Sequence, residues 1–474
     1  MAEKHVYRFG VDVNGVDVTE KAGATPDEAK WITGGKGCNL AEMASIGLPV
    51  PPGFTIDCQT CVWYSTHNNT WPEGILDTIA KYQADLEKRM GKKLGDANDP
   101  LLVSVRSGAP FSMPGMMDTV LNLGLNDTSV QGLIKQTGNE RFAWDSYRRF
   151  VSMFSDVVMD VDKQLFEDAL NEKKAEKGVK LDTELDAGDL KDLVKTFKEI
   201  FCANVDGQKY PEVVKDGKVS FPDDPYLQLR LAEQAVFGSW MNDRAIVYRA
   251  ANKIPDNLGT AVNVQTMVFG NKGNTSATGV AFTRNPADGT NERYGDFLVN
   301  AQGEDVVAGI RNTQPIADLV KIPELKEAGE ELFHVFEVLE DHYHDMMDIE
   351  FTIEQGKLWM LQTRVGKRTA LSALRVAIQM VQEGRITKEQ AVMRVAPDQL
   401  DQLLHPQFDP SAKYDVLTKG MNASPGAAVG EVVFSSADAV AAKEAGTPCV
   451  LVRWETTPDD LRGMVAAEGI LTSH

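Results

Sequence analysis

A run of alternating polar and apolar residues near position 350 constrains the fold more than any other part of this 474-residue chain. In Asp348-Ile-Glu350-Phe-Thr-Ile353, one residue separates the two carboxylates, and apolar residues lie between and after them. Side chains of a β-strand alternate between its faces, so Asp348 and Glu350 project together while the apolar residues enter a core. The pattern predicts a strand with one polar and one buried face.

The next run, Leu358-Trp-Met-Leu-Gln-Thr-Arg364, follows a short turn and predicts a second strand that pairs with the first. The same alternation places Gln362 and Arg364 on one face. Whether this is the face of Asp348 and Glu350 depends on the pairing register, because a slip of one residue moves every side chain to the other face. The sequence leaves the register open.

Two carboxylates on one face repel each other unless a cation lies between them. Hard oxygen ligands of this kind suit Mg²⁺ that bridges the phosphates of a nucleotide. We therefore hypothesise a metal site at Asp348 and Glu350; the alternative is two solvated carboxylates on an exposed sheet. We interpret the nearby His342 and His344 as part of an acidic helix end and not as metal ligands.

Two basic residues near glycines are candidates for phosphate binding. Lys36 lies in Gly34-Gly-Lys-Gly37 near an expected helix start, where glycines allow close backbone approach and lysine supplies a mobile charge. The spacing is not that of a Walker A loop, so an ordinary turn is the alternative. Arg106, at a predicted strand end, has a guanidinium that suits phosphate oxygens. The glycine-containing loop 270–279 and Arg284 just beyond it are weaker candidates for the same role.

The composition excludes several classes of function. The formal net charge is −20, and no basic stripe interrupts it, so nucleic acid and anionic lipid are not expected partners. No apolar run is long enough to span a membrane, and the first ten residues lack the apolar core of a secretory signal, so we expect a cytoplasmic location. The five cysteines fit a reducing compartment, and we interpret Cys58 and Cys61 as buried or half-buried thiols.

Several long strings resemble the pyruvate, phosphate dikinase family, in one order from about Thr33 to Leu471. Related phosphoenolpyruvate synthases and glucan dikinases share the architecture but not these strings. The strings in this chain that match the family are Gly-Gly-Lys-Gly-Cys-Asn-Leu-Ala-Glu-Met (34–43), Ser-Val-Arg-Ser-Gly (104–108), Ser-Met-Pro-Gly-Met-Met-Asp-Thr-Val-Leu-Asn-Leu-Gly-Leu-Asn (112–126), Asp-Ser-Tyr-Arg-Arg-Phe (145–150), Asn-Val-Gln-Thr-Met-Val-Phe-Gly-Asn (263–271), Thr-Gly-Val-Ala-Phe-Thr-Arg-Asn-Pro (278–286), Asn-Ala-Gln-Gly-Glu-Asp-Val-Val-Ala-Gly (300–309) and Asp-Ile-Glu-Phe-Thr-Ile (348–353).

The resemblance implies a multidomain chain of α/β and α+β class. Residues 1–365 would form an ATP-grasp nucleotide-binding domain, with a helical subdomain at about 160–240. Residues 366–412 would form a helical linker, and residues 413–474 part of a swivelling β/β/α phosphohistidine domain. The family's C-terminal (β/α)₈ (TIM) barrel, which takes pyruvate and phosphoenolpyruvate, is not expected in this chain.

The reaction that the resemblance implies is ATP + phosphate + pyruvate giving AMP + diphosphate + phosphoenolpyruvate, through phosphohistidine. This chain is expected to bind Mg²⁺ with ATP or AMP, and phosphate, without completing the cycle, and the full-length protein is expected to be a homodimer. The alternatives are a non-catalytic nucleotide-binding fragment and a phosphoenolpyruvate synthase-like dikinase. Asp348 and Glu350 would bind the metal, and the implied ATP ligands are Lys36, Arg106, Gln265, Glu304, Asp348, Glu350, Gln362 and Arg364.

The sequence departs from the family pattern at three places. Ala277 replaces a common glycine, and Ala109-Pro-Phe111 stands where a basic residue often follows the glycine. The family's Gly-Gly-Met-Thr-Ser-His motif follows a Gly-Ile-Leu-Thr strand by two residues, whereas here Gly469-Ile-Leu-Thr472 runs directly into Ser473-His474. The spacing places the phosphoacceptor beyond the last residue. The alternative is that a deletion makes His474 the acceptor.

Overall fold

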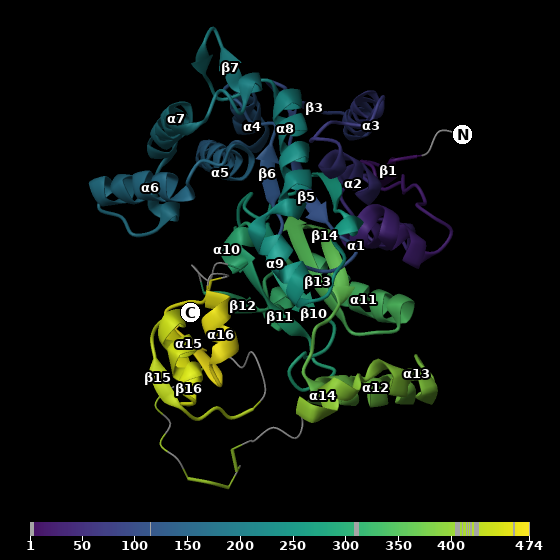
Figure 1. Ribbon diagram of the computed structural model, residues 1–474. Helices are drawn as coiled ribbons and strands as arrows, with labels where there is room; N and C mark the ends of the chain where they lie inside the picture. Colours follow the sequence, from purple (N-terminus) through teal and green to yellow (C-terminus); the bar gives the residue numbers. More distant parts are fainter. Residues whose placement is uncertain are drawn as a thin grey trace.

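The structure is a computed structural model that describes residues 4–113, 115–307, 312–402, 408–409, 411–413, 415, 417, 420, 426–457 and 460–473. It contains two five-stranded sheets, a group of helices beside the first sheet, further helices around the second, and a small C-terminal unit (Figure 1). This arrangement confirms the mixed α/β character expected from the sequence. Within the described residues the sheets are open, and none closes into a barrel.

The first sheet has the strand order β1-β2-β9-β5-β6, and every neighbouring pair is antiparallel. Its core includes Val105, Val120, Val262 and Val264, whose side chains are fully buried. The strands are β1 (Val6–Phe9), β2 (Gly53–Ile56), β9 (Ala261–Thr266), β5 (Val103–Gly108) and β6 (Thr119–Leu123).

Helices that lie between the strands of the first sheet in the chain share its core. In Figure 1 most of them surround the first sheet in the upper half of the view, and three of them fall in the segment 160–240 that was expected to be helical. Phe221 packs edge-on against Phe150, Phe154 and Phe201 at ring-centroid distances of 5.9, 5.5 and 5.1 Å. The helices are α2 (Cys58–Thr66), α3 (Ile75–Met90), α4 (Ser129–Thr137), α5 (Glu140–Met159), α6 (Lys163–Lys177), α7 (Ala187–Asn204), α8 (Pro225–Gly238) and α9 (Asp243–Ala251).

The second sheet has the order β12-β11-β10-β13-β14 and is also antiparallel throughout. One of its faces forms a second core with α1 and α11. Its strands are β12 (Gln314–Pro315), β11 (Tyr294–Val299), β10 (Ala277–Phe282), β13 (Met347–Glu354) and β14 (Lys357–Val365), and the neighbouring helices are α1 (Pro26–Ser45), α10 (Gly303–Val307) and α11 (Lys326–Tyr343).

Three helices follow β14, and a separate unit ends the chain. The helices are α12 (Ala370–Gln382), α13 (Lys388–Arg394) and α14 (Pro397–Gln402).

The C-terminal unit has a parallel sheet of order β15-β16-β17 and its own small core. Its elements are β15 (Glu431–Val433), α15 (Ser436–Glu444), β16 (Cys449–Arg453), α16 (Leu461–Ala466) and β17 (Gly469–Thr472). None of the helices in the described residues is long and apolar enough to cross a lipid bilayer.

A glycine interrupts α1 and brings the helix against the first sheet. Gly34 has φ 69° and ψ 168°, which are not helical values, so a new helical segment begins just after it. A Cβ atom on Gly34 would lie 1.6 Å from the carbonyl oxygen of Gly108, at the end of β5. Lys36 therefore lies in the first turn of the second segment of α1, as its glycine-rich surroundings suggested.

Replacement of Gly34 by alanine is expected to lower the free energy of unfolding by at least about 2 kcal/mol, because this backbone conformation is essentially restricted to glycine and the new methyl group would clash with Gly108. Urea denaturation followed by circular dichroism measures the effect. Gly238→Ala is the control, since this helical position has open space around it and alanine there should change stability by no more than about 1 kcal/mol. Equal effects of the two substitutions would contradict the role of Gly34.

Candidate functional site

The hairpin formed by β13 and β14 carries the polar face that the sequence predicted. A two-residue turn with positive φ at Gln355 and Gly356 pairs Glu354 with Lys357. Without interruption this register would leave Gln362 facing the core. However, the register shifts beyond Phe351, so that Glu350 pairs with Gln362.

The extra residue at this β-bulge is Leu361, which has no partner in β13. Burial along β14 changes parity at the same point, because Leu358, Met360 and Thr363 are the buried residues. A bulge places two residues opposite one and turns the following side chains over. Gln362 and Arg364 consequently share the face of Glu350 and Asp348, which answers the question that the sequence left open.

Arg106 reaches from the first sheet to this face. Its Nη2 donates to Oε2 of Glu350 at 3.2 Å, and its Nη1 donates to the carbonyl of Leu361 at 3.4 Å. Gln362 donates from Nε2 to the other oxygen of Glu350 at 3.0 Å. Glu350 is thus held by one residue of each sheet, and the bulge supplies one of the two acceptors for Arg106.

Asp348 makes a separate ion pair within the second sheet. Arg364 donates from Nε to Oδ2 of Asp348 at 2.6 Å. Burial raises the pKa of the Asp348 carboxyl above its usual value, and the adjacent Arg364 opposes that rise. The two carboxylates of the predicted metal site therefore lie side by side, and each accepts from a different arginine.

Lys36 completes the positive charge of the site. Within the described part of the chain its ammonium has no hydrogen-bond or ion-pair partner. Burial lowers the pKa of Lys36 to about 7, and the nearby charges of Arg106 and Arg364 lower it further than Glu350 raises it. An amine that lacks its own counterion beside two guanidiniums is prepared for an anion supplied from outside the protein.

Of the other residues predicted for the site, Gln265 makes its printed contact to a different segment, and the remaining two lie partly or wholly outside the described residues. Gln265 is buried in β9 and donates from Nε2 to the carbonyl of Pro51 at 3.1 Å. Glu304 is part of α10, but its side chain is outside the described residues. His474 lies wholly outside them.

Arg284, which the sequence offered as a weaker phosphate candidate, is fully buried in an ion-pair network. It makes two hydrogen bonds to Glu340, of 2.9 and 2.7 Å, and two to Glu383, of 2.9 and 2.6 Å. Gln379 accepts a further one at 3.0 Å. Glu340 belongs to α11 and the other two partners belong to α12 or follow it directly, so Arg284 attaches α12 to the second sheet and is not available to a ligand.

The cysteine pair is buried, as the sequence predicted. Cys58 and Cys61 are free and buried, and burial raises the pKa of the Cys61 thiol to about 11. His342 contacts Oε1 of Glu42 at 2.7 Å. A search of the described residues finds no group of three or more His, Cys, Asp and Glu side chains that would hold a metal by itself.

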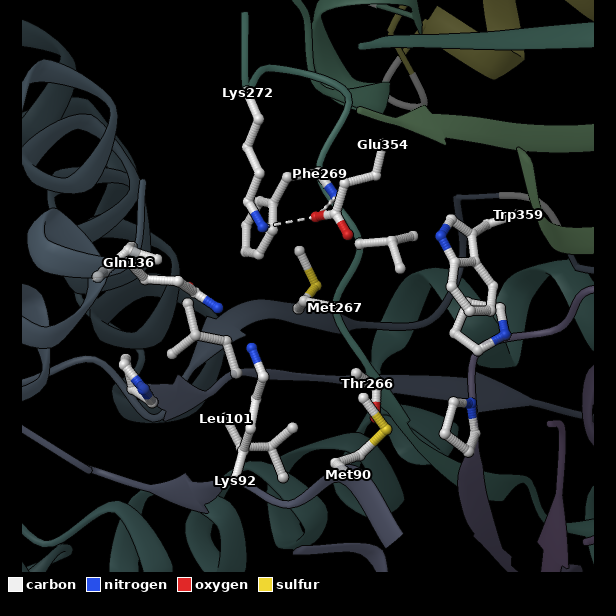
Figure 2. Close-up of a pocket in the computed structure, with 16 residues that line it drawn as sticks. Met90, Lys92, Leu101, Gln136, Thr266, Met267, Phe269, Lys272, Glu354 and Trp359 are labelled. Carbon is white, nitrogen blue, oxygen red and sulfur yellow. Dashed lines mark hydrogen bonds and ion pairs between the residues drawn. The ribbon is translucent and has the colours of Figure 1, made fainter. Parts of the chain in front are cut away.

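A pocket opens at the other end of the same polar face, by the hairpin turn. It is lined by the segment that joins the two sheets, including Thr266, Met267 and Phe269, and by Trp359 of β14 (Figure 2). Most of the lining is apolar, but the buried hydroxyl of Thr266 has no partner among the described residues. Such a hydroxyl can be satisfied by a ligand or by water.

An ion pair closes the rim of this pocket. Lys272 contacts Oε1 of Glu354 at 2.7 Å, and the same oxygen accepts from the backbone N–H of Phe269 at 3.1 Å (Figure 2). The glycine-containing loop 270–276 lies beside this hairpin turn, because Gly356 donates to the carbonyl of Thr275 at 2.8 Å. The sequence analysis missed the pocket, although Glu354 continues the alternation of Asp348 and Glu350.

The family of the chain can now be stated. The family described as pyruvate phosphate dikinase, AMP/ATP-binding domain, matches residues 66–324 and 317–385. The chain belongs to this family. Pyruvate phosphate dikinase relatives also match along most of its length. The protein named pyruvate, phosphate dikinase from Rhizobium meliloti (strain 1021) is 53% identical over 481 residues, which cover 99% of this chain and 51% of the relative.

Two further relatives give the same result. The pyruvate, phosphate dikinase of Clostridium symbiosum is 54% identical over 93% of this chain and 49% of its own length. The chloroplastic pyruvate, phosphate dikinase of Flaveria pringlei is 54% identical over 94% of the chain and 45% of its own length. The chain thus spans about half the length of these curated relatives. It comprises the ATP-binding part of a pyruvate phosphate dikinase, as the resemblance predicted.

Replacement of Arg284 by methionine is expected to lower the free energy of unfolding by about 3 kcal/mol, because it leaves the buried Glu340 with only the more distant Arg385, at 3.8 Å, as a cation. Arg375→Met is the matched control: Arg375 is 40% exposed and lies 3.8 Å from Asp288, so its loss should cost no more than about 0.5 kcal/mol. Urea denaturation compares the two. An Arg284 variant as stable as the control would show that the network does not hold α12 in place.

Proposed function

We propose that the two sheets form an ATP-grasp domain and that Mg·ATP binds between them. The observation that carries the proposal is the bridge from Arg106 of the first sheet to Glu350 of the second, with Lys36 and Arg364 beside it. Phosphoryl transfer depends mainly on positioning and on neutralising the negative charge of the phosphates. Three cations and two carboxylates on facing elements supply both requirements.

Each side chain of the cluster has a proposed role. Lys36, Arg106 and Arg364 bind the phosphates, and Gln362 orients Glu350 and donates to a phosphate oxygen. Asp348 and Glu350 are hard oxygen donors that suit Mg²⁺, which usually takes only one or two carboxylates and completes its coordination with phosphate oxygens and water. When bound, the metal neutralises charge that develops on the phosphates. Gln265 and Glu304 remain proposed ATP ligands on the resemblance alone.

The pocket by the hairpin turn is the proposed position of the base. Glu354 follows Glu350 by four residues in β13, which corresponds to about 13 Å along a strand. This distance is comparable to the length of an extended nucleotide from its base to its outer phosphates. Met267, Phe269 and Trp359 supply apolar contacts for a planar base, and the Thr266 hydroxyl supplies a hydrogen bond.

For the whole protein we propose the dikinase reaction, in which ATP, phosphate and pyruvate give AMP, diphosphate and phosphoenolpyruvate through phosphohistidine. The names of the relatives support this activity. Pyruvate and phosphoenolpyruvate would bind only to a barrel domain, which the described residues do not form. We also propose that the whole protein is a cytoplasmic homodimer. This chain by itself is proposed to bind Mg·ATP without producing phosphoenolpyruvate.

Calorimetry with Mg·ATP tests the proposal. Binding is expected, and Lys36→Met should weaken it by about ten-fold or more, because a charged hydrogen bond to phosphate is lost. Lys30→Met is the control: Lys30 is exposed on the same helix and should leave the affinity unchanged. Absence of binding at millimolar Mg·ATP, or equal losses in the two variants, would contradict the proposed site.

Binding is also expected to take up protons above neutral pH. The pKa of Lys36 is lowered to about 7, and a bound triphosphate would raise it. At pH 8 the amine is therefore mostly neutral before binding and protonated after it, whereas below about pH 6 it is protonated in both states. Calorimetry in buffers of different ionisation enthalpy measures this uptake. Uptake that is unchanged in Lys36→Met would assign it to another group.

A further inference from the structure

Four of the five charged groups in the site neutralise one another. Arg106 pairs with Glu350 at 3.2 Å, and Arg364 pairs with Asp348 at 2.6 Å. One oxygen of each carboxylate that suits Mg²⁺ thus already accepts a hydrogen bond from a guanidinium group, and the second oxygen of Glu350 accepts one from the Gln362 amide. Lys36 is the fifth group, so three cations face two carboxylates and the cluster has a formal net charge of +1.

This charge balance disfavours each ligand by itself. Free Mg²⁺ would have to displace the guanidinium from each carboxylate or share the carboxylate with it, and it would raise the net charge of this half-buried cluster to about +3. Free ATP, with about four negative charges, would attract the arginines but would also meet two carboxylates that have lost their partners. Mg·ATP, with about two negative charges, brings the cluster closest to neutrality.

We propose that the two arginines mask the carboxylates, so that Mg²⁺ and ATP each bind weakly alone and tightly together, by an exchange of ion pairs. In this exchange the arginines leave Asp348 and Glu350 for the phosphates, and the carboxylates take the metal. The inference rests on the proposed function and deepens it, because it states what controls occupation of that site. Coupling of this kind is reciprocal: ATP strengthens metal binding by the factor by which the metal strengthens ATP binding.

The two ion pairs differ in what they connect. Arg364 and Asp348 belong to the same sheet, whereas Arg106 and Glu350 belong to different sheets. Exchange at Arg364 is therefore local to one hairpin. Exchange at Arg106 replaces a direct contact between the sheets with one that runs through the nucleotide. The Arg106 contact to the carbonyl of Leu361 is not part of the exchange, because it is made by the other guanidinium nitrogen.

The test uses the purified protein and Mn²⁺ as a paramagnetic substitute for Mg²⁺, with free Mn²⁺ measured by electron paramagnetic resonance in the absence of nucleotide. The wild-type protein is expected to bind Mn²⁺ weakly. Arg364→Met exposes Asp348 and should tighten Mn²⁺ binding by about ten-fold, although it weakens binding of Mg·ATP. A residue that only stabilised the fold would lower both affinities.

Two control variants make the result specific. Arg364→Lys keeps a cation beside Asp348 and should restore most of the masking. Arg375→Met removes an arginine of the same exposure, 40%, that pairs with Asp288 elsewhere, and should not change Mn²⁺ affinity. Circular dichroism confirms folding, and Arg106→Met provides a second unmasked variant if Arg364→Met does not fold.

The outcomes separate this inference from the proposed function. Wild-type affinity for Mn²⁺ alone that equals its affinity in the presence of ATP would overturn the masking. An unmasked variant that is folded and gains no Mn²⁺ affinity would also overturn it. Failure of the wild-type protein to bind Mg·ATP would overturn the proposed function and, with it, the exchange, whatever the metal titration alone shows.

Discussion

The extra residue that Leu361 contributes to β14 turns Gln362 and Arg364 toward the face that carries Asp348 and Glu350. Without it, the turn at Gln355 and Gly356 would set a register in which an arginine pointed into an apolar core, at a large cost in free energy. Leu361 has no residue opposite it in β13, and Arg106 of the first sheet donates to its carbonyl. One irregularity in a hairpin thus assembles the polar face and helps to join the two sheets.

The electrostatics of the site follow from this arrangement. The kink at Gly34 brings Lys36 to the end of β5 in the first sheet. The β13–β14 hairpin of the second sheet supplies the two carboxylates, Asp348 and Glu350, and the guanidinium of Arg364. The pKa of Lys36 falls because the side chain is withdrawn from solvent near cations, and its ammonium pairs with no carboxylate among the described residues. The site therefore holds more positive charge than its own carboxylates neutralise, which is the condition for binding an anion such as a nucleotide complexed with one metal ion.

Local patterns in the sequence predicted the strands of the hairpin, the shared face of Asp348 and Glu350, and the position of Lys36 near a helix start. They could not predict the bulge, because Leu361 is an ordinary strand residue and only the three-dimensional pairing shows that it lacks a partner. The role of Arg284 could not be predicted from local sequence either. Near a glycine-containing loop it suggests phosphate binding, but its partners Glu340 and Glu383 lie 56 and 99 residues away. The pocket by the hairpin turn combines several distant segments, and no single one of them has a recognisable pattern.

We propose that a triphosphate and its metal bind at the polar face of the second sheet, beside Arg106 of the first. A crystal structure of the protein with Mg²⁺ and a non-hydrolysable ATP analogue tests it most directly. The account predicts the metal on Asp348 and Glu350, phosphate oxygens within hydrogen-bond distance of Lys36 and Arg106, and the base against Trp359. A nucleotide bound elsewhere, with the Arg106–Glu350 and Arg364–Asp348 pairs intact, would contradict it.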